Sequence, residues 1–134
     1  MPSNTTKEKF KIAVIEDDEV MSGAVSEELE DAGFMVIKAF DGKEGLRLVL
    51  KEKPDVILLD IMMPKMDGLA MMRKVRRSSP WGKNVLCVIL TNLAVDSKTL
   101  KKVLGEELSS PLMVKSEIRL QDVVKQVKKV LKNR

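Results

Sequence analysis

The chain has 134 residues, of which 44% are apolar; this is enough for one buried core and excludes a wholly disordered protein. Histidine is absent and cysteine occurs once, at Cys87, which excludes a histidine-based triad, an internal disulfide and most zinc sites. The formal net charge is +4, and residues 115–134 alone carry seven basic and two acidic residues, so the surplus comes from one C-terminal segment.

Apolar runs alternate with amphipathic segments along the chain, after a polar segment, residues 1–8, that we expect to be flexible. Five runs predict strands: Phe10–Ile15, Phe34–Ala39, Val56–Leu59, Val85–Leu90 and Leu112–Val114. Three of these strands contain stretches that are apolar throughout, as is typical of parallel strands covered on both faces. Apolar residues at helical spacing predict helices whose stripes begin at Met21, Leu46, Leu69, Leu100 and Leu120.

This alternation of strand and helix, repeated five times, predicts an α/β fold. We expect a (βα)5 arrangement: a doubly wound, five-stranded parallel sheet of the flavodoxin-like type, with helices on both faces. It forms one domain over residues 9–132, and we expect no output domain in this chain.

Local patterns predict where several elements begin. Asp18 reads as a helix-start residue, the glycine-containing segment Asp41–Gly45 as a turn leading into a helix, and Ser116 as the cap of the last helix. Trp81 is expected in a loop before the fourth strand. Cys87 lies in the middle of an apolar run and is expected to be an inert core residue rather than a redox sensor.

Polar side chains follow four of the five predicted strands. The first strand ends in Glu16 and Asp17, and the third, fourth and fifth end in Asp60, Thr91 and Lys115. Ligands of an open parallel sheet bind at the carboxyl ends of its strands. Each of these residues alone would be a solvated turn residue, but a cluster of carboxylates facing one lysine indicates a ligand site.

The three acids Glu16, Asp17 and Asp60 would repel one another unless a cation lay among them, and hard oxygen ligands suit Mg²⁺. Lys115 and Thr91 would then offer a cation and a hydroxyl donor to a phosphoryl group. Such a site can carry a phosphoryl group on a carboxylate, with Asp60 as the nucleophile.

Four stretches together resemble the receiver domain of bacterial two-component response regulators: Ile15–Asp18, Leu59–Gly68, Leu90–Thr91 and Val114–Lys115. The resemblance extends from Lys9 to Leu131, and its most specific part is the run Asp-Ile-Met-Met-Pro-Lys-Met-Asp-Gly at residues 60–68. It implies a phosphoprotein that receives its phosphoryl group from a histidine kinase or phosphotransfer protein, with Mg²⁺ as the cofactor.

The resemblance also implies a role for each matching residue. Asp60 would be the phosphoacceptor, Asp17 a direct Mg²⁺ ligand, and Glu16 the holder of a metal-bound water. The backbone carbonyl of Met62 would complete the protein ligands of the metal. Thr91 would provide the switch hydroxyl, and Lys115 would bind the phosphoryl group.

Three positions depart from the family pattern. Asn92 follows Thr91 where alanine or glycine is usual, and Leu112 takes the place of an aromatic residue that moves on activation. Ser116 stands where a proline usually follows a cis peptide bond, which leaves the isomer at Lys115 open. We therefore expect Thr91, Asn92 and Leu112 to form a switch that differs from the usual one.

The leading hypothesis is a signalling domain that catalyses only its own phosphorylation and dephosphorylation. The alternatives are a pseudo-receiver that binds proteins without using phosphate, and a phosphatase-like enzyme with an aspartate nucleophile. The enzyme would want a second acid two residues after Asp60, where this chain has Met62.

The expected partners are proteins. A downstream protein partner would bind near the last helix, whose lysine face either meets an acidic partner or is solvated. We expect a monomer or a weak phosphorylation-dependent dimer. The longest apolar run has six residues, at 85–90, and no broad basic stripe with aromatic residues occurs, so we expect a cytoplasmic protein without a membrane or direct nucleic-acid partner.

Overall fold

The apolar runs form a five-stranded parallel sheet in the computed structural model, which describes residues 9–61, 63, 65–91 and 110–134. The strand order is β2-β1-β3-β4-β5, so the chain winds outward from β1 in one direction to β2 and in the other to β3, as in doubly wound sheets. The strands are β1 (Lys11–Ile15), β2 (Met35–Ala39), β3 (Val56–Leu59), β4 (Leu86–Thr91) and β5 (Leu112–Val114). The predicted fold class is confirmed.

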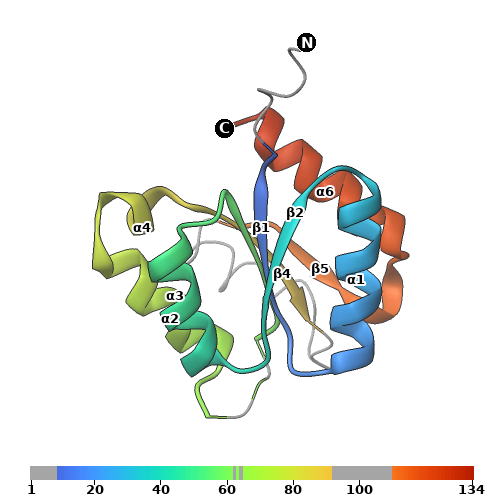
Figure 1. Cartoon of the computed structure of the whole chain (residues 1–134). Helices are drawn as coiled ribbons and strands as arrows, with labels where there is room; N and C mark the ends of the chain where they lie inside the picture. Colours follow the sequence, from blue (N-terminus) through green and yellow to red (C-terminus); the bar gives the residue numbers. More distant parts are fainter. Residues whose placement is uncertain (1–8, 62, 64, 92–109) are drawn as a thin grey trace.

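Helices cover both faces of the sheet. In Figure 1, α2 and α3 lie on one side of the strands, and α1 and α6 lie on the other. The helical elements are α1 (Glu19–Asp31), α2 (Gly42–Glu52), α3 (Gly68–Ser78), α4 (Pro80–Asn84), the short 3-10 helix η2 (Lys115–Glu117) and α6 (Leu120–Lys132). Within the described residues, no helix has the length and apolar character needed to cross a lipid bilayer. The helix predicted around Leu100 lies outside the described residues.

Two apolar clusters form the core, one on each face of the sheet. Alternate residues of β1 point to opposite faces, so Ile12 packs in one cluster and Ala13 in the other. The cluster that contains Ala13 also includes Val75 of α3, and the cluster that contains Ile12 also includes Val127 of α6. Burial of one large aliphatic side chain contributes roughly 1.5–3 kcal/mol, so these clusters hold the strand ends in fixed positions.

Aspartates start three of the helices. The side chain of Asp18 accepts hydrogen bonds from the N–H groups of Val20 and Met21, and that of Asp41 accepts one from the N–H of Glu44. The predicted helix starts at Asp18 and Asp41 are confirmed. Asp67 caps α3 in the same way, through the N–H of Ala70.

Two local predictions are wrong. Ser116 does not cap the last helix, because residues 115–117 form η2 and the N-terminal cap of α6 is Arg119, whose N–H donates to Asp122 Oδ2 at 2.8 Å. Trp81 lies in the short helix α4 rather than in a loop, since the Ser79 hydroxyl accepts a bond from Gly82 N–H at that helix start. The Lys115–Ser116 peptide bond is trans.

Candidate functional site

The ends of β1 and β3 meet where the strand order reverses, the position at which doubly wound sheets bind ligands. Glu16 follows β1, and its N–H donates to the carbonyl oxygen of Ala39 at 3.1 Å. Asp60 follows β3, and its N–H donates to the carbonyl oxygen of Ile15 at 3.0 Å. These backbone bonds extend the parallel ladder by one residue and hold both acids at one edge of the sheet.

Three carboxylates gather at this edge. Glu16, Asp17 and Asp60 each place one carboxylate oxygen within 4.8 Å of the others. Glu16 and Asp60 are both only 4% exposed, whereas Asp17 is exposed and gives the cluster its solvent-facing member. Asp18 instead caps α1, and its N–H donates to Glu16 Oε2 at 3.1 Å.

Lys115 brings a cation to the two buried carboxylates from the end of β5. Its Nζ lies 3.1 Å from Asp60 Oδ2 and also forms an ion pair with the Glu16 carboxylate. Only 16% of the lysine side chain is exposed. Asp60 and Lys115 are 55 residues apart in sequence, so the sheet itself creates this contact.

The charges in the cluster are not balanced. Burial raises the pKa of Glu16 to about 7, and the neighbouring charge of Asp60 acts in the same direction, while hydrogen bonds from Lys115 and from the Asp18 N–H act against them. Burial alone would lower the pKa of Lys115, but its hydrogen bond to Glu16 and the charge of Asp60 outweigh burial and raise that pKa. One lysine therefore does not neutralise the site, and a further cation would be favourable.

Thr91 ends β4 at the same edge. It is fully buried, and among the described residues its hydroxyl has no hydrogen-bond partner. Leu112 is half-buried in β5 opposite Ile89, which is two residues before Thr91. The structure thus brings Glu16, Asp17, Asp60 and Lys115 together, while Met62 and Asn92 lie outside the described residues.

Comparison with known families identifies this arrangement. The family model named "Response regulator receiver domain" matches residues 12–127. The chain belongs to this family. It is 34% identical over 122 residues to the alkaline phosphatase synthesis transcriptional regulatory protein PhoP of Bacillus subtilis, a match that covers 91% of this chain and 48% of PhoP. The receiver domain therefore spans about half the length of this curated relative.

Solved receiver structures share the fold. The Vibrio cholerae chemotaxis protein CheY4 is similar with a TM-score of 0.79 and 28% identity, covering 92% of this chain and 99% of CheY4. The receiver domain of the Francisella response regulator 1452 has a TM-score of 0.80 and 27% identity, and the match covers 93% of this chain and 98% of the Francisella chain. The receiver domain of Klebsiella pneumoniae RstA has a TM-score of 0.74 and 25% identity, and the match covers 88% of this chain and 95% of the RstA chain. These likenesses agree with the strand order described above.

The donor set of this receiver domain fits Mg²⁺. All three side chains offer hard oxygen atoms, and Mg²⁺ prefers a few carboxylates combined with several retained waters. The exposed position of Asp17 leaves room for such waters. Lys115 already contacts Glu16 and Asp60, so a bound divalent ion would lie close to the lysine ammonium. An anionic group that contacts both cations would reduce the repulsion between them.

Gly68 supports the site, a role that apolar patterning did not predict. A Cβ atom at this residue would lie 2.3 Å from the carbonyl oxygen of Asp60, and the Gly68 N–H donates to the carbonyl oxygen of Ile61 at 2.9 Å. Only glycine allows α3 to begin this close to the backbone of the phosphoacceptor candidate. The Asp-Gly pair at the end of the 60–68 motif was the available signal.

Proposed function

We propose that this receiver domain accepts a phosphoryl group on Asp60 from a histidine kinase or phosphotransfer protein, with Mg²⁺ as the cofactor, and then signals to a partner protein. The observation that carries the proposal is the buried Asp60 carboxylate, which has oxygens of two further acids within 4.8 Å and Lys115 Nζ at 3.1 Å. A carboxylate used only for structure would need its lysine partner but not the two extra carboxylates.

In the proposed transfer, a carboxylate oxygen of Asp60 attacks phosphorus, a new O–P bond forms, and the N–P bond to the donor imidazole breaks. Asp17, Asp60 and the Met62 carbonyl would hold Mg²⁺, and Glu16 would hold one of its bound waters; the ion would supply positive charge to the phosphoryl oxygens. Lys115 contacts the Asp60 carboxylate already, and its ammonium would pair with a phosphoryl oxygen.

The proposed switch begins at Thr91. Its buried hydroxyl has no hydrogen-bond partner among the described residues, and leaving such a group unpaired is costly. A phosphoryl oxygen on Asp60 would provide an acceptor for it. Because Leu112 pairs with Ile89 in the same strand pair, a shift of Thr91 would reach β5 through packing, with Asn92 as the third switch residue.

The test is the intact mass of the protein after incubation with acetyl phosphate and Mg²⁺. The natural chain should gain one phosphoryl group, Asp60→Asn should gain none, and the matched variant Asp31→Asn, at an exposed position of α1, should behave like the natural chain. Phosphorylation of Asp60→Asn would place the acceptor elsewhere and refute the assignment. A natural chain that stays unmodified while Mg²⁺ still stabilises it would identify a pseudo-receiver instead.

A further inference from the structure

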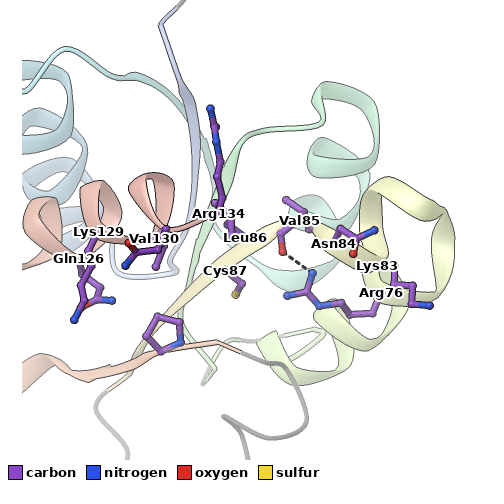
Figure 2. Close-up of a pocket in the computed structure, with 12 residues that line it drawn as sticks. Arg76, Lys83, Asn84, Val85, Leu86, Cys87, Gln126, Lys129, Val130 and Arg134 are labelled. Atoms are coloured by element: carbon purple, nitrogen blue, oxygen red, sulfur yellow. Dashed lines mark hydrogen bonds between the residues drawn. The ribbon is translucent and has the colours of Figure 1, made fainter.

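A surface hollow lies at the start of β4, at the opposite end of that strand from Thr91. Its volume is about 640 Å³, which is within the range of ligand pockets in proteins. The first residues of β4, Leu86 and Cys87, form its floor between α6 on one side and the α3–α4 region on the other (Figure 2). None of the residues assigned to the phosphoacceptor site contributes to it.

The described lining of this hollow is basic. It contains four cationic side chains and no acidic one: Arg76, Lys83, Lys129 and Arg134. Figure 2 shows Arg76 and Lys83 on the side of α3 and α4, and Lys129 on the side of α6. The cations thus flank an apolar floor instead of converging on one point, which suits a ligand with several separated negative charges and an apolar body.

The hollow continues into a neighbouring one. A neighbouring cavity of about 470 Å³ shares four lining residues with the first, namely Asn84, Val85, Leu86 and Arg134. It adds Pro54, Asp55, Pro80 and Trp81, so it brings one carboxylate. We call the two together the N-terminal groove, since they run along the edge where β4 begins. The groove carries cations on both sides of its floor, and its end near Trp81 combines apolar side chains with the single carboxylate of Asp55.

Two of the cations are held in place by other parts of the fold. Arg76 donates hydrogen bonds to the carbonyl oxygens of Gly82 and Val85, at 3.0 and 2.6 Å. The Arg134 guanidinium carbon lies 4.8 Å from the centre of the Phe10 ring. Lys83 and Lys129 are exposed, and neither forms an ion pair within the described part of the chain. A bound anion would therefore meet these two lysines without displacing an acid.

We propose that the N-terminal groove binds an acidic segment of a partner protein. Carboxylates of the segment would pair with Lys83, Lys129 and Arg134, and one apolar side chain would pack against Trp81. A peptide fits better than a nucleic acid, because Trp81 is the chain's only tryptophan and no row of aromatic side chains is present for stacking bases. The groove lies at the other end of the strands from Asp60, so it binds without phosphorylation.

The probe is a short glutamate-rich peptide with a central leucine and no tryptophan, titrated into the full chain. Binding is followed by Trp81 fluorescence and by backbone amide chemical shifts, which should change at Leu86, Cys87 and Val130 and not at Asp60. The charge-reversal pair Lys83→Glu with Lys129→Glu should weaken binding about tenfold or more, since two separate contacts are inverted.

A matched control pair, Lys74→Glu with Lys125→Glu, makes the same change in net charge at exposed positions that do not line the groove. It should retain binding within about twofold. If charge reversal unfolds the first pair, Lys83→Gln with Lys129→Gln provides the same comparison with a smaller perturbation. Asp60→Asn should bind the peptide like the natural chain, which keeps this proposal separate from the proposed phosphorylation.

Three results would overturn the proposal. Equal loss of binding in both pairs would mean that the peptide follows the general positive charge and not the groove. Binding of adenosine triphosphate or a single-stranded oligonucleotide, without binding of the peptide, would assign the groove to phosphate ligands. Peptide-induced shifts confined to the Asp60 end of the sheet would place the contact at the other edge.

Discussion

At Cys87 a nucleophilic side chain is kept in its unreactive form. The thiol is buried in β4, and burial raises its pKa to about 11 from an ordinary value of 9.0, although a hydrogen bond with Ser110 and the charge of Arg76 act in the opposite direction. The thiolate is the reactive species, so a rise of about 2 in pKa reduces its amount at pH 8 about a hundredfold. This agrees with the prediction of an inert core residue.

The first prediction concerns this thiol. Iodoacetamide should alkylate Cys87 at pH 8 at least about a hundredfold more slowly in the folded chain than in urea, because burial limits access as well as ionisation. The rate in the folded chain should rise with pH up to about 11, since the thiolate increases over that range. Mass spectrometry of timed samples measures both rates, and equal rates with and without urea would contradict the assigned burial.

Lys115 provides the second prediction, because it pairs with two buried carboxylates. Lys115→Ala should lower the free energy of unfolding by about 2–3 kcal/mol in the absence of Mg²⁺, since removing one partner leaves buried charge uncompensated. Mg²⁺ should restore part of this loss. Phosphorylation by acetyl phosphate should become poor, since only the metal would then neutralise the phosphoryl charge.

Lys11→Ala is the control for that measurement. Lys11 pairs with Glu52 at 3.1 Å, but the two side chains are 28% and 32% exposed. Loss of a more exposed pair should cost less than about 1 kcal/mol and should not respond to Mg²⁺. Urea unfolding of both variants, with and without Mg²⁺, compares them directly, and similar losses in both would argue against a special role for Lys115.

Strand-end reasoning predicted the residues that meet at the site, and it worked because parallel strands end at one edge. Glu16, Asp60 and Lys115 each follow an apolar run, so their meeting required only the strand order. The lack of a hydrogen-bond partner for the Thr91 hydroxyl among the described residues, and the close approach at Gly68, were not predictable in this way. Both depend on interatomic distances that apolar patterning does not contain.

The position of α3 beside the site depends on Gly68, the first residue of that helix. A Cβ atom at Gly68 would lie 2.3 Å from the carbonyl oxygen of Asp60 and 3.0 Å from the Ile61 Cα. Both are backbone atoms, so relief requires the start of α3 or the end of β3 to move. The element that follows the motif is thus coupled to the position of Asp60.

We expect Gly68→Ala to destabilise the fold by about 2–3 kcal/mol and to slow phosphorylation of Asp60, because the added methyl group displaces backbone. Gly23→Ala is the matched control. Gly23 lies within α1, and within the described part of the chain no atom of another element comes within 4 Å of the place that an alanine methyl group would take there. Alanine should therefore stabilise the fold by roughly 0.5–1 kcal/mol. Thermal unfolding measures both, and a neutral Gly68→Ala would show that α3 is not held so tightly.

Element boundaries were less predictable than the elements themselves. Asp18 and Asp41 were assigned correctly because an aspartate side chain at a helix start accepts hydrogen bonds from the N–H groups of the first turn, which is a local property of the sequence. The assignment of Ser116 was wrong because this residue lies within η2, which ends before the stripe that begins at Leu120, and the three residues between Ser116 and Leu120 do not distinguish a 3-10 turn from an α-helix. The short α4 was missed since five residues are too few to show a helical period.

At the scale of the whole molecule, the acidic cluster and the basic groove lie at opposite edges of the sheet. The carboxylates of Glu16, Asp17 and Asp60 lie at the carboxyl ends, and the basic lining of the N-terminal groove lies where β4 begins. The overall charge of +4 therefore hides a local site that is short of cations. A divalent ion and an acidic peptide should accordingly bind at separate places.

The last prediction follows from this separation. Mg²⁺ at about ten times its dissociation constant should raise the free energy of unfolding by about 1.4 kcal/mol, because it binds only the folded cluster. Asp17→Asn should remove most of that gain, whereas Glu27→Gln, at an exposed position in the middle of α1, should keep it. Trp81 lies in α4 and lines the groove, so its fluorescence in the folded state should hardly change with Mg²⁺. Urea unfolding followed by circular dichroism, together with a Mg²⁺ titration of Trp81 emission, measures both effects. Strong quenching of Trp81 by Mg²⁺, or full stabilisation of Asp17→Asn, would contradict this layout of the two ends.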